Sequence, residues 1–269
     1  MIQEHPITGE LSELLELAKR AANSAAAVHR SAIQEGGFTV YAKTSSSDLL
    51  TEVDRESERR LVAAIREARP NDEILGEEGA NFDGDSGVRW LLDPLDGTTN
   101  FVHRYPAHSV AVGIEIAGRR RIGVVHDTFS NHVYWGVVGH GARCDNEPIA
   151  VRHESDLSLA LIGTGFLAYP EVRRTQADLL REILPRVRDI RRSGCPSLDI
   201  CAVASGRLNG FYEAGLGRWD IAAGAAIAEA AGATVLLLDS KILPDPLLIV
   251  ANAKLAAALV SALTEAGAL

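Results

Sequence analysis

The fold and the chemistry of this chain are decided by one stretch, Trp90-Leu-Leu-Asp93-Pro-Leu-Asp96-Gly-Thr-Thr-Asn100-Phe101. It begins as an apolar strand and runs straight into two carboxylates, a glycine and two hydroxyls. Pro94 restricts the residue before it to extended backbone, so we expect Asp93 at the end of the strand. Gly97 permits a sharp turn that would bring Asp96 back beside Asp93. A helix cap alone would explain Asp96 but would leave Asp93 as a costly unpaired acid, so the pair indicates a bound cation.

Two other acidic motifs lie far from this stretch in the sequence. Glu77 and Glu78 follow a short apolar run, and Asp220 follows Trp219 at the start of an Ala-rich segment. Singly, each has an ordinary structural explanation, a solvated turn for the glutamates and a helix N-cap for Asp220. Together with the aspartates of the strand they form a set of hard oxygen ligands without neighbouring His or Cys patterning. Such a set favours Mg²⁺ or Mn²⁺ over zinc or copper.

Two hydroxyl residues make the same region suitable for a phosphate. Thr98 and Thr99 follow Gly97 at the expected start of a helix, where backbone N–H groups and the helix dipole attract anions. A small octahedral cation held by a few carboxylates keeps positions open for water and for a phosphate oxygen. The sequence therefore predicts a metal-assisted phosphate site.

The composition narrows the class of protein. The chain has 269 residues, 46% of them hydrophobic and 23% charged, which is enough for a sizeable core. Its 27 Lys and Arg against 36 Asp and Glu give a formal net charge of −9, which disfavours a nucleic-acid partner. No apolar run reaches the roughly 18 to 20 residues of a membrane span, and residues 1–10 do not resemble a secretion signal. We therefore expect a cytoplasmic protein without a membrane partner.

The cysteines and histidines follow none of the familiar spacings. The three cysteines, Cys144, Cys195 and Cys201, show no CxxC pattern, so we expect neither a disulfide framework nor a zinc ribbon. The eight histidines show no HExxH or other metal-binding spacing. We assign His126, His132 and the other histidines no catalytic role, and we expect the thiols to be inert.

The periodicity of the chain predicts two halves with a boundary near residue 150. Residues 1–150 are typical of an α+β unit, and residues 151–269 of an α/β unit. The first half should contain a helix at 11–33 with an Ala-rich contact face. A second helix should run from a capping box at Thr51–Asp54 to a point before Pro70. Antiparallel strands should follow at 88–93, 109–116, 122–127 and 133–138. The second should contain strands at 159–163, 210–213, 235–238 and 247–251 and helices at 172–184, 197–205, 220–231 and the C-terminus. Because no Pro/Gly/Ser-rich linker separates the halves, we expect an extensive interface between them.

Four motifs together resemble the inositol monophosphatase family of Mg²⁺-dependent, lithium-sensitive phosphatases. They occur in the family's order: Lys43 through Asp54, Gly76-Glu77-Glu78, Asp93 through Phe101, and Trp219 through Gly224 followed by Glu229, Ala231 and Gly232. The resemblance covers nearly the whole chain. It implies a layered αβαβα fold, a homodimer, and a metal site supplied by both halves.

The resemblance also implies roles in catalysis. The metal ligands would be the side chains of Glu77, Asp93, Asp96 and Asp220 and the backbone carbonyl of Leu95. Glu77 and Thr98 would hold and activate the attacking water, and Asp54 would hydrogen-bond Thr98. The reaction would be direct in-line hydrolysis without a phosphoenzyme.

The substrate contacts follow from the same resemblance. They would come from Asp96, Gly97, Thr98, Gly194, Pro196, Glu213 and Asp220, with Lys43 as the basic residue of a loop near the metals. Glu213 would bind a substrate hydroxyl, the alternative being a surface acid at a strand end. Pro196 departs from the small residues usual in the family. Because proline has no N–H and a fixed φ, the contact to the substrate ring is expected to be lost or reshaped.

We therefore predict a Mg²⁺-dependent phosphomonoesterase that acts on a small phosphorylated metabolite, with myo-inositol monophosphate as the expected substrate. Within the same family the alternatives are histidinol-phosphate phosphatase, 3′-phosphoadenosine nucleotidase and fructose-1,6-bisphosphatase. A regulatory binding protein that has kept the phosphatase fold is disfavoured, because none of the four acidic ligands is missing.

Overall fold

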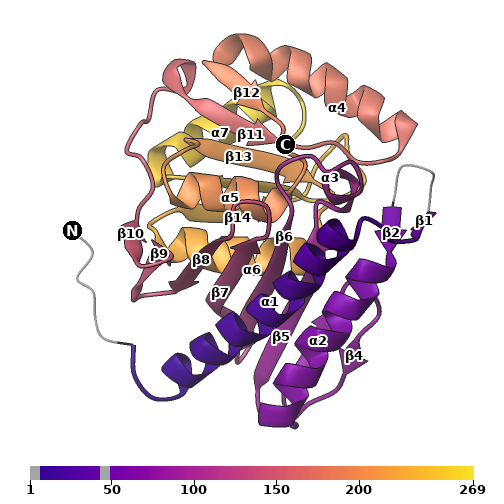
Figure 1. Cartoon of the computed structure of the whole chain (residues 1–269). Helices are drawn as coiled ribbons and strands as arrows, with labels where there is room; N and C mark the ends of the chain where they lie inside the picture. Colours follow the sequence, from indigo (N-terminus) through magenta and orange to yellow (C-terminus); the bar gives the residue numbers. More distant parts are fainter. Residues whose placement is uncertain (1–6, 43–48) are drawn as a thin grey trace.

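Helices and sheets alternate in layers in the computed structural model, which describes residues 7–42 and 49–269 (Figure 1). The first layer pairs α1 (Glu10–Glu35) with α2 (Glu52–Ala68), and these helices pack on an eight-stranded sheet. A second helical layer, α5 (Pro196–Ala204) and α6 (Arg218–Ala230), lies between that sheet and a five-stranded one. The outer face of the five-stranded sheet is covered by α4 (Pro170–Ile183) and α7 (Ala253–Glu265). The predicted αβαβα arrangement is confirmed.

The eight-stranded sheet has the order β10-β9-β8-β7-β6-β5-β3-β4. From β5 through β10 every neighbouring pair is antiparallel, as the hairpin spacing predicts. β3 instead joins β5 in parallel, a pairing that the sequence analysis did not foresee. The bounds are β3 (Glu73–Gly76), β4 (Asn81–Phe82), β5 (Val88–Asp96), β6 (Ser109–Ile116), β7 (Arg119–Asp127), β8 (His132–Val137), β9 (Gly141–Cys144) and β10 (Glu147–Ile149).

The five-stranded sheet has the order β12-β11-β13-β15-β14 and is mixed. β11 pairs in parallel with β12 and β13, whereas β15 runs antiparallel to both of its neighbours. The bounds are β11 (Leu161–Thr164), β12 (Asp189–Arg191), β13 (Gly210–Ala214), β14 (Thr234–Leu238) and β15 (Leu247–Ala251). Residue 150 falls between the two sheets, but α6 of the second half packs on strands of the first. The division into two units therefore stays a prediction.

The remaining elements are short. β1 (Val40–Ala42) pairs with β2 (Leu49–Thr51), and α3 (Thr98–Val102) follows β5. Two 3₁₀ turns, η1 (Leu157–Leu159) and η2 (Leu184–Arg186), connect elements of the second half.

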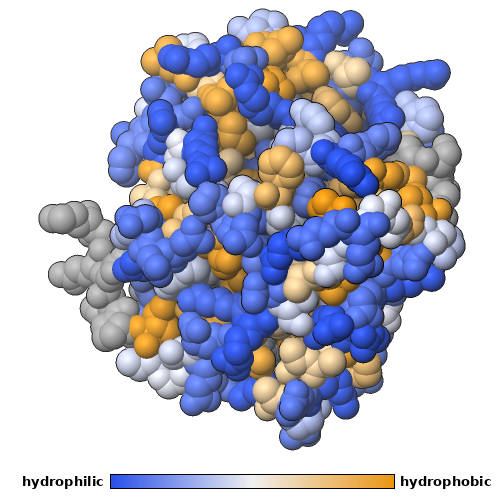
Figure 2. Space-filling model, in the orientation of Figure 1, coloured by the Kyte–Doolittle hydropathy of each residue, from blue (hydrophilic) through white to orange (hydrophobic). Residues whose placement is uncertain are grey.

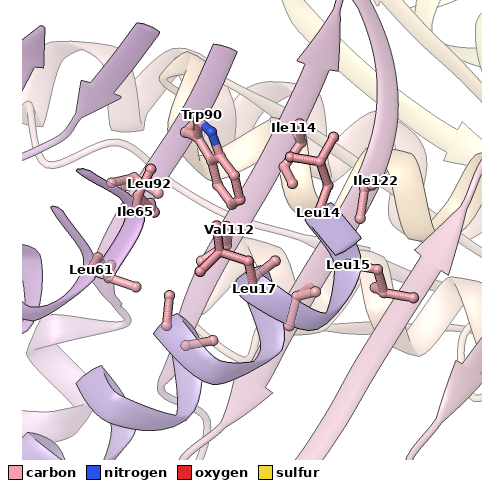
Figure 3. Packing of buried hydrophobic residues seen from close by; sticks show 14 of the residues in the cluster. Leu14, Leu15, Leu17, Leu61, Ile65, Trp90, Leu92, Val112, Ile114 and Ile122 are labelled. Carbon is pink, nitrogen blue, oxygen red and sulfur yellow. The ribbon is translucent and has the colours of Figure 1, made fainter. Parts of the chain in front are cut away.

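The helix α1 packs on the eight-stranded sheet through the face that its leucines and alanines predict. Leu14 lies beside Ile114 and Leu17 beside Val112, both residues of β6 (Figure 3), and all four are buried. Further along the helix the buried stripe is made of alanines: Ala18, Ala21, Ala22, Ala25 and Ala26. These small side chains let the second half of α1 approach β7 and α2 closely.

The surface is mostly hydrophilic on the face shown in Figure 2, with hydrophobic residues in scattered patches. Among the helices within residues 7–42 and 49–269, none combines the length and the apolar character that a membrane crossing needs.

A row of glycines seats α6 on the eight-stranded sheet. Gly113, Gly123 and Gly136 lie directly opposite one another on β6, β7 and β8. A Cβ at Gly113 would lie 2.5 Å from the Cβ of Ala222, and one at Gly123 would collide with the carbonyl oxygen of Ala223. Because these glycines have no side chains, α6 lies in a groove on the sheet. The depth of this groove sets how close the residues of α6 come to the strands of the first half.

We predict that Gly123→Ala lowers the free energy of unfolding by about 1–3 kcal/mol, because the added methyl group must push α6 away from the sheet. Gly37→Ala is the matched control, since nothing lies within 4 Å of the methyl group there. Urea denaturation of both variants checks the prediction, which is wrong if the two lose the same stability.

Candidate active site

Three of the predicted metal ligands, Glu77, Asp93 and Asp220, meet in one place. Each offers a carboxylate oxygen, and these atoms all lie within 4.8 Å of one another. β3 pairs in parallel with β5, with Gly76 opposite Leu92, so that the next residues of both strands, Glu77 and Asp93, emerge side by side. The first turn of α6 brings Asp220 to them from the other half of the chain. Three acids far apart in the sequence therefore form one cluster.

Asp93 is the buried centre of this cluster. Its side chain is 1% exposed, and its Oδ1 accepts a hydrogen bond from the backbone N–H of Leu95 at 3.0 Å. Burial raises the pKa of Asp93 well above its usual range, and repulsion from Glu77, Asp96 and Asp220 adds to the shift. A carboxylate in these surroundings is unfavourable as an anion unless a cation compensates it.

Asp96 lies differently from the sequence-based prediction. β5 continues past Asp93 to Asp96, with an irregularity in its pairing with β6 between the two residues, so Asp93 is not the end of the strand. Gly97 does make the predicted turn, with φ of 84°. The Asp96 Oδ2 accepts hydrogen bonds from the Ser197 N–H at 2.7 Å and the Cys195 thiol at 3.1 Å. Asp96 thus ties the cluster to the start of α5, while its charge still acts on Asp93.

From the sequence alone, Asp220 could have been an ordinary N-cap of its helix. The structure excludes this explanation. α6 begins two residues earlier than predicted, at Arg218, with Gly217 as N-cap. Asp220 is the third residue of the helix, and its Oδ2 accepts a hydrogen bond from the Gly217 N–H at 2.7 Å. This bond fixes the carboxylate at the helix start, facing Glu77 and Asp93.

The Thr98 hydroxyl is held between two acceptors. It lies 3.1 Å from Asp54 Oδ1 and 3.0 Å from the Leu95 carbonyl oxygen, the first being the contact that the family resemblance implies. Asp54 is itself fully buried in the predicted capping box of α2, where its Oδ2 accepts from the Thr51 N–H at 2.7 Å and the Thr51 hydroxyl at 2.6 Å. Because the hydroxyl donates its single proton inward, its oxygen is available as an acceptor on the side of the cluster.

A cavity of about 830 Å³ opens beside the cluster. Of the predicted site residues, its described wall includes Glu77, Gly97, Thr98 and Gly194. Arg192 contributes a cation to the same wall, and further lining comes from Phe166, Arg173 and Leu180 around α4. The described wall therefore combines one acid of the cluster, Glu77, with two arginines and the apolar side chains around α4. Lys43 lies outside the described residues.

Glu213 and Pro196 are not among the described residues of this wall, although Glu213 lines a smaller adjoining pocket that shares Phe166 with it. Glu213 is 8% exposed within β13, which excludes the surface acid that was its structural alternative. Burial raises the pKa of Glu213 well above its usual range, and the opposing pull of Arg192 is smaller. Pro196 is the first residue of α5, a position where its missing N–H costs the helix nothing.

Two positioning residues escaped the sequence analysis. Glu58 on α2 accepts hydrogen bonds from the N–H groups of Glu78 and Ala80, both at 2.9 Å, and so holds the loop that carries Glu77. His29 on α1 supports the other side: its Nε2 lies 3.0 Å from the Pro94 carbonyl oxygen. Since a carbonyl only accepts, Nε2 carries the proton. In both cases the sequence signal was a polar residue within the buried stripe of an amphipathic helix.

His29 also belongs to a buried hydrogen-bond network with Thr128 and His108. With Nε2 protonated, His29 Nδ1 accepts from the Thr128 hydroxyl at 3.1 Å, and His108 Nδ1 lies 2.6 Å from the same hydroxyl. Burial lowers the pKa of His29 to about 3, and burial also lowers the pKa values of His108 and His126. These histidines are therefore neutral in the folded protein at neutral pH.

The fold defines a class, the layered αβαβα proteins that carry an acidic cluster between their halves. The model of the inositol monophosphatase family matches residues 10–268, and the chain belongs to this family. It is similar to Inositol-1-monophosphatase SuhB of Mycobacterium tuberculosis, with 43% identity over 212 residues, 76% of this chain and 73% of that protein. It is 35% identical over 227 residues to the Nus factor SuhB of Pasteurella multocida, covering 84% of this chain and 85% of that protein. The crystal structure of the extragenic suppressor protein SuhB of Bartonella henselae matches with a TM-score of 0.87 and 30% identity, over 94% of this chain and 99% of that one.

We predict that acid weakens the fold through His29. Its folded pKa, about 3, lies below its unfolded value of 6.5, so the unfolded chain binds more protons between these values and stability falls as the pH falls through that window. The loss from this residue is about 3 kcal/mol between pH 7 and pH 4.

The change that checks this is His29→Gln, whose amide retains a donor for the Pro94 carbonyl but does not titrate. Denaturant unfolding measured across the same pH range should show a shallower dependence for this variant than for the parent. His153→Gln, at an exposed site, is the control and should keep the parent slope. Equal slopes in the parent and His29→Gln would contradict the assignment.

Proposed function

We propose that this member of the family is a Mg²⁺-dependent phosphomonoesterase that hydrolyses a small phosphorylated metabolite. The observation that carries the proposal is the meeting of Glu77, Asp93 and Asp220 in one cluster, of which Glu77 shares the cavity wall with Thr98. These groups are oxygen donors, and the central one is buried among like charges. Hard oxygen donors that need a compensating cation suit Mg²⁺, with Mn²⁺ as a substitute.

The ligands that fit a divalent cation are the three clustered carboxylates, with Asp96 and the Leu95 carbonyl completing the set implied by the family. A Mg²⁺ ion held by these residues would lower the pKa of a coordinated water and would neutralise charge that develops on the phosphate. The Cys195 thiol and the Ser197 N–H at the start of α5 both donate to Asp96 Oδ2. The Oδ1 atom of Asp96 could therefore serve as a metal ligand.

The chain's own residues would position the water and the phosphate. Glu77, partly exposed in the cavity wall, can accept a proton from a water at its carboxylate. Thr98, anchored through Asp54, can accept a hydrogen bond from the same water and so fix its direction of approach. Arg192 adds positive charge on the wall where the phosphate ester would enter. This arrangement suits in-line attack by water without a covalent intermediate.

The expected substrate is myo-inositol monophosphate, supported by the names of the mycobacterial relatives. Histidinol phosphate, 3′-phosphoadenosine nucleotides and fructose 1,6-bisphosphate are the alternatives within the family. Phosphate release from each of these compounds, with and without Mg²⁺, distinguishes them. A protein that releases phosphate from none of them with Mg²⁺ present would contradict the proposal.

We predict that Asp93→Asn folds normally but loses at least about a hundredfold in kcat, because the central metal ligand loses its charge. Initial rates with p-nitrophenyl phosphate at saturating Mg²⁺ measure the effect. Asp189→Asn, an exposed aspartate of β12, is a control of the same chemistry and should keep the parent rate. Parent activity in Asp93→Asn would remove the assignment.

We predict that Glu213→Gln raises KM for an inositol phosphate more than KM for p-nitrophenyl phosphate. Only the polyol offers a hydroxyl to this buried side chain. A weaker hydrogen bond to that hydroxyl should therefore affect the binding of the polyol substrate alone. Equal changes for both substrates would exclude a contact between Glu213 and the substrate.

A second candidate function is a non-catalytic one, favoured by the relatives named Nus factor SuhB. The formal net charge of −9 disfavours a surface that grips nucleic-acid phosphates, so we keep the prediction of no nucleic-acid partner. The homodimer and the cytoplasmic location stay predictions too. If the chain acts as a regulator alone, Asp93→Asn should complement a deletion of its gene as well as the parent does.

A further inference from the structure

A second group of metal-ligating side chains lies on β8 and β9 of the eight-stranded sheet, several strands away from β5. His132 at the start of β8, Cys144 at the end of β9 and Asp145 in the turn that follows offer ligand atoms within 4.8 Å of one another. In the sheet order, β6 and β7 separate β8 from β5, which carries Asp93. At about 4.8 Å per strand, the two clusters are more than ~14 Å apart and independent.

The backbone holds Asp145 in place beside His132. The Asp145 N–H donates to the Val133 carbonyl at 2.7 Å, and the Val133 N–H donates back to Asp145 Oδ1 at 2.9 Å. The Trp135 indole N–H donates to the Asp145 carbonyl at 2.9 Å. The remaining carboxylate oxygen, Oδ2, then lies 2.8 Å from His132 Nδ1. Oδ2 and Nδ1 thus hydrogen-bond each other, and a metal ion bound between them would replace this hydrogen bond.

Cys144 joins this pair through strand pairing. It lies opposite Tyr134 in the β8–β9 register, two residues along β8 from His132. The Tyr134 hydroxyl hydrogen-bonds the Cys144 sulfur, a contact that would stabilise a thiolate. The side chains of His132 and Asp145 are 47% and 45% exposed, so an ion can enter from solvent.

We propose that His132, Cys144 and Asp145 bind one Zn²⁺ ion, with water as a fourth ligand. One thiolate, one imidazole and one carboxylate form a donor set that suits Zn²⁺ and is unlike the all-oxygen cluster of the active site. Zinc lies about 2.0–2.3 Å from such donors, so tetrahedral ligands are roughly 3.3–3.7 Å apart. Side-chain rotations would therefore have to separate the His132 and Asp145 ligand atoms from their 2.8 Å contact and bring the sulfur, now within 4.8 Å of both, to bonding distance of the ion.

Binding must release a proton. Burial raises the pKa of the Cys144 thiol, and the neighbouring Asp145 charge adds to this, so the free sulfur carries its proton at neutral pH. The Zn–S bond forms as the S–H proton leaves to solvent, and His132 binds through its neutral ring. No electron is transferred. The bound ion would clamp the turn after β9 to β8 at the edge of the sheet, and would stabilise the folded state by binding it preferentially.

Cobalt substitution tests the site directly, because Co²⁺ bound to a thiolate gives a near-ultraviolet charge-transfer band. Metal-stripped full-length protein is titrated with Co²⁺ in excess Mg²⁺, which occupies the oxygen cluster. We expect the band to saturate at one equivalent and to disappear when Zn²⁺ is added. Cys144→Ser should abolish it, and His132→Gln and Asp145→Asn should each weaken Co²⁺ binding at least tenfold.

Three controls make the outcome decisive. Cys201→Ala, which removes a buried thiol on α5, and Asp93→Asn, which disables the oxygen cluster, should both retain the band. Cys144→Ser should keep the parent circular dichroism spectrum and the parent Mg²⁺-dependent rate. A band that survives in Cys144→Ser, or no band in the parent at excess Co²⁺, would overturn the proposal, whether or not the chain is a phosphatase.

Discussion

The structure depends on the enforced proximity of like charges. Glu77, Asp93 and Asp220 are held within 4.8 Å of one another around a fully buried carboxyl, an arrangement that repels itself in the absence of a cation. The charges cannot move apart, since Asp220 is fixed by the N-terminus of α6 and Asp93 by the N–H of Leu95. A divalent ion that bound here would relieve this repulsion, so the repulsion increases the affinity of the folded protein for such an ion. Under the proposed function, that ion would act on a phosphate bound in the cavity whose wall includes Glu77 and Thr98.

The backbone creates this proximity through two features. The parallel pairing of β3 with β5 sends Glu77 and Asp93 out of the same sheet end. The glycine row on β6, β7 and β8 lets α6 sit deep enough for Asp220 to reach them from the second half of the chain. Glu58 and His29 then brace the two loops from the helical layer on the opposite face. Elements from each of the first three layers therefore contribute to the position of the carboxylates.

Much of this could be predicted from the sequence, where the signal is local. The Leu and Ala stripe of α1, the capping box at Thr51 and the hairpin spacing from β6 to β8 each reflect a periodicity that the structure confirms. The acids could be singled out because they follow apolar segments. What escaped was non-local: the parallel pairing of the four-residue β3, and the continuation of β5 past Asp93 to an Asp96 bonded to α5. His132, Cys144 and Asp145 share no motif spacing, because strand pairing alone brings them together.

The account is tested most directly by the thermal stability of the protein as Mg²⁺ is added. If the cluster is a repulsive site that a cation relieves, the parent Tm should rise steadily with Mg²⁺ concentration, because the ion binds the folded state alone. Asp93→Asn should start with a Tm at least as high without metal, since the repulsion is gone, and should show no such rise. A parent Tm that ignores Mg²⁺, or a variant that responds to Mg²⁺ as the parent does, would contradict the account.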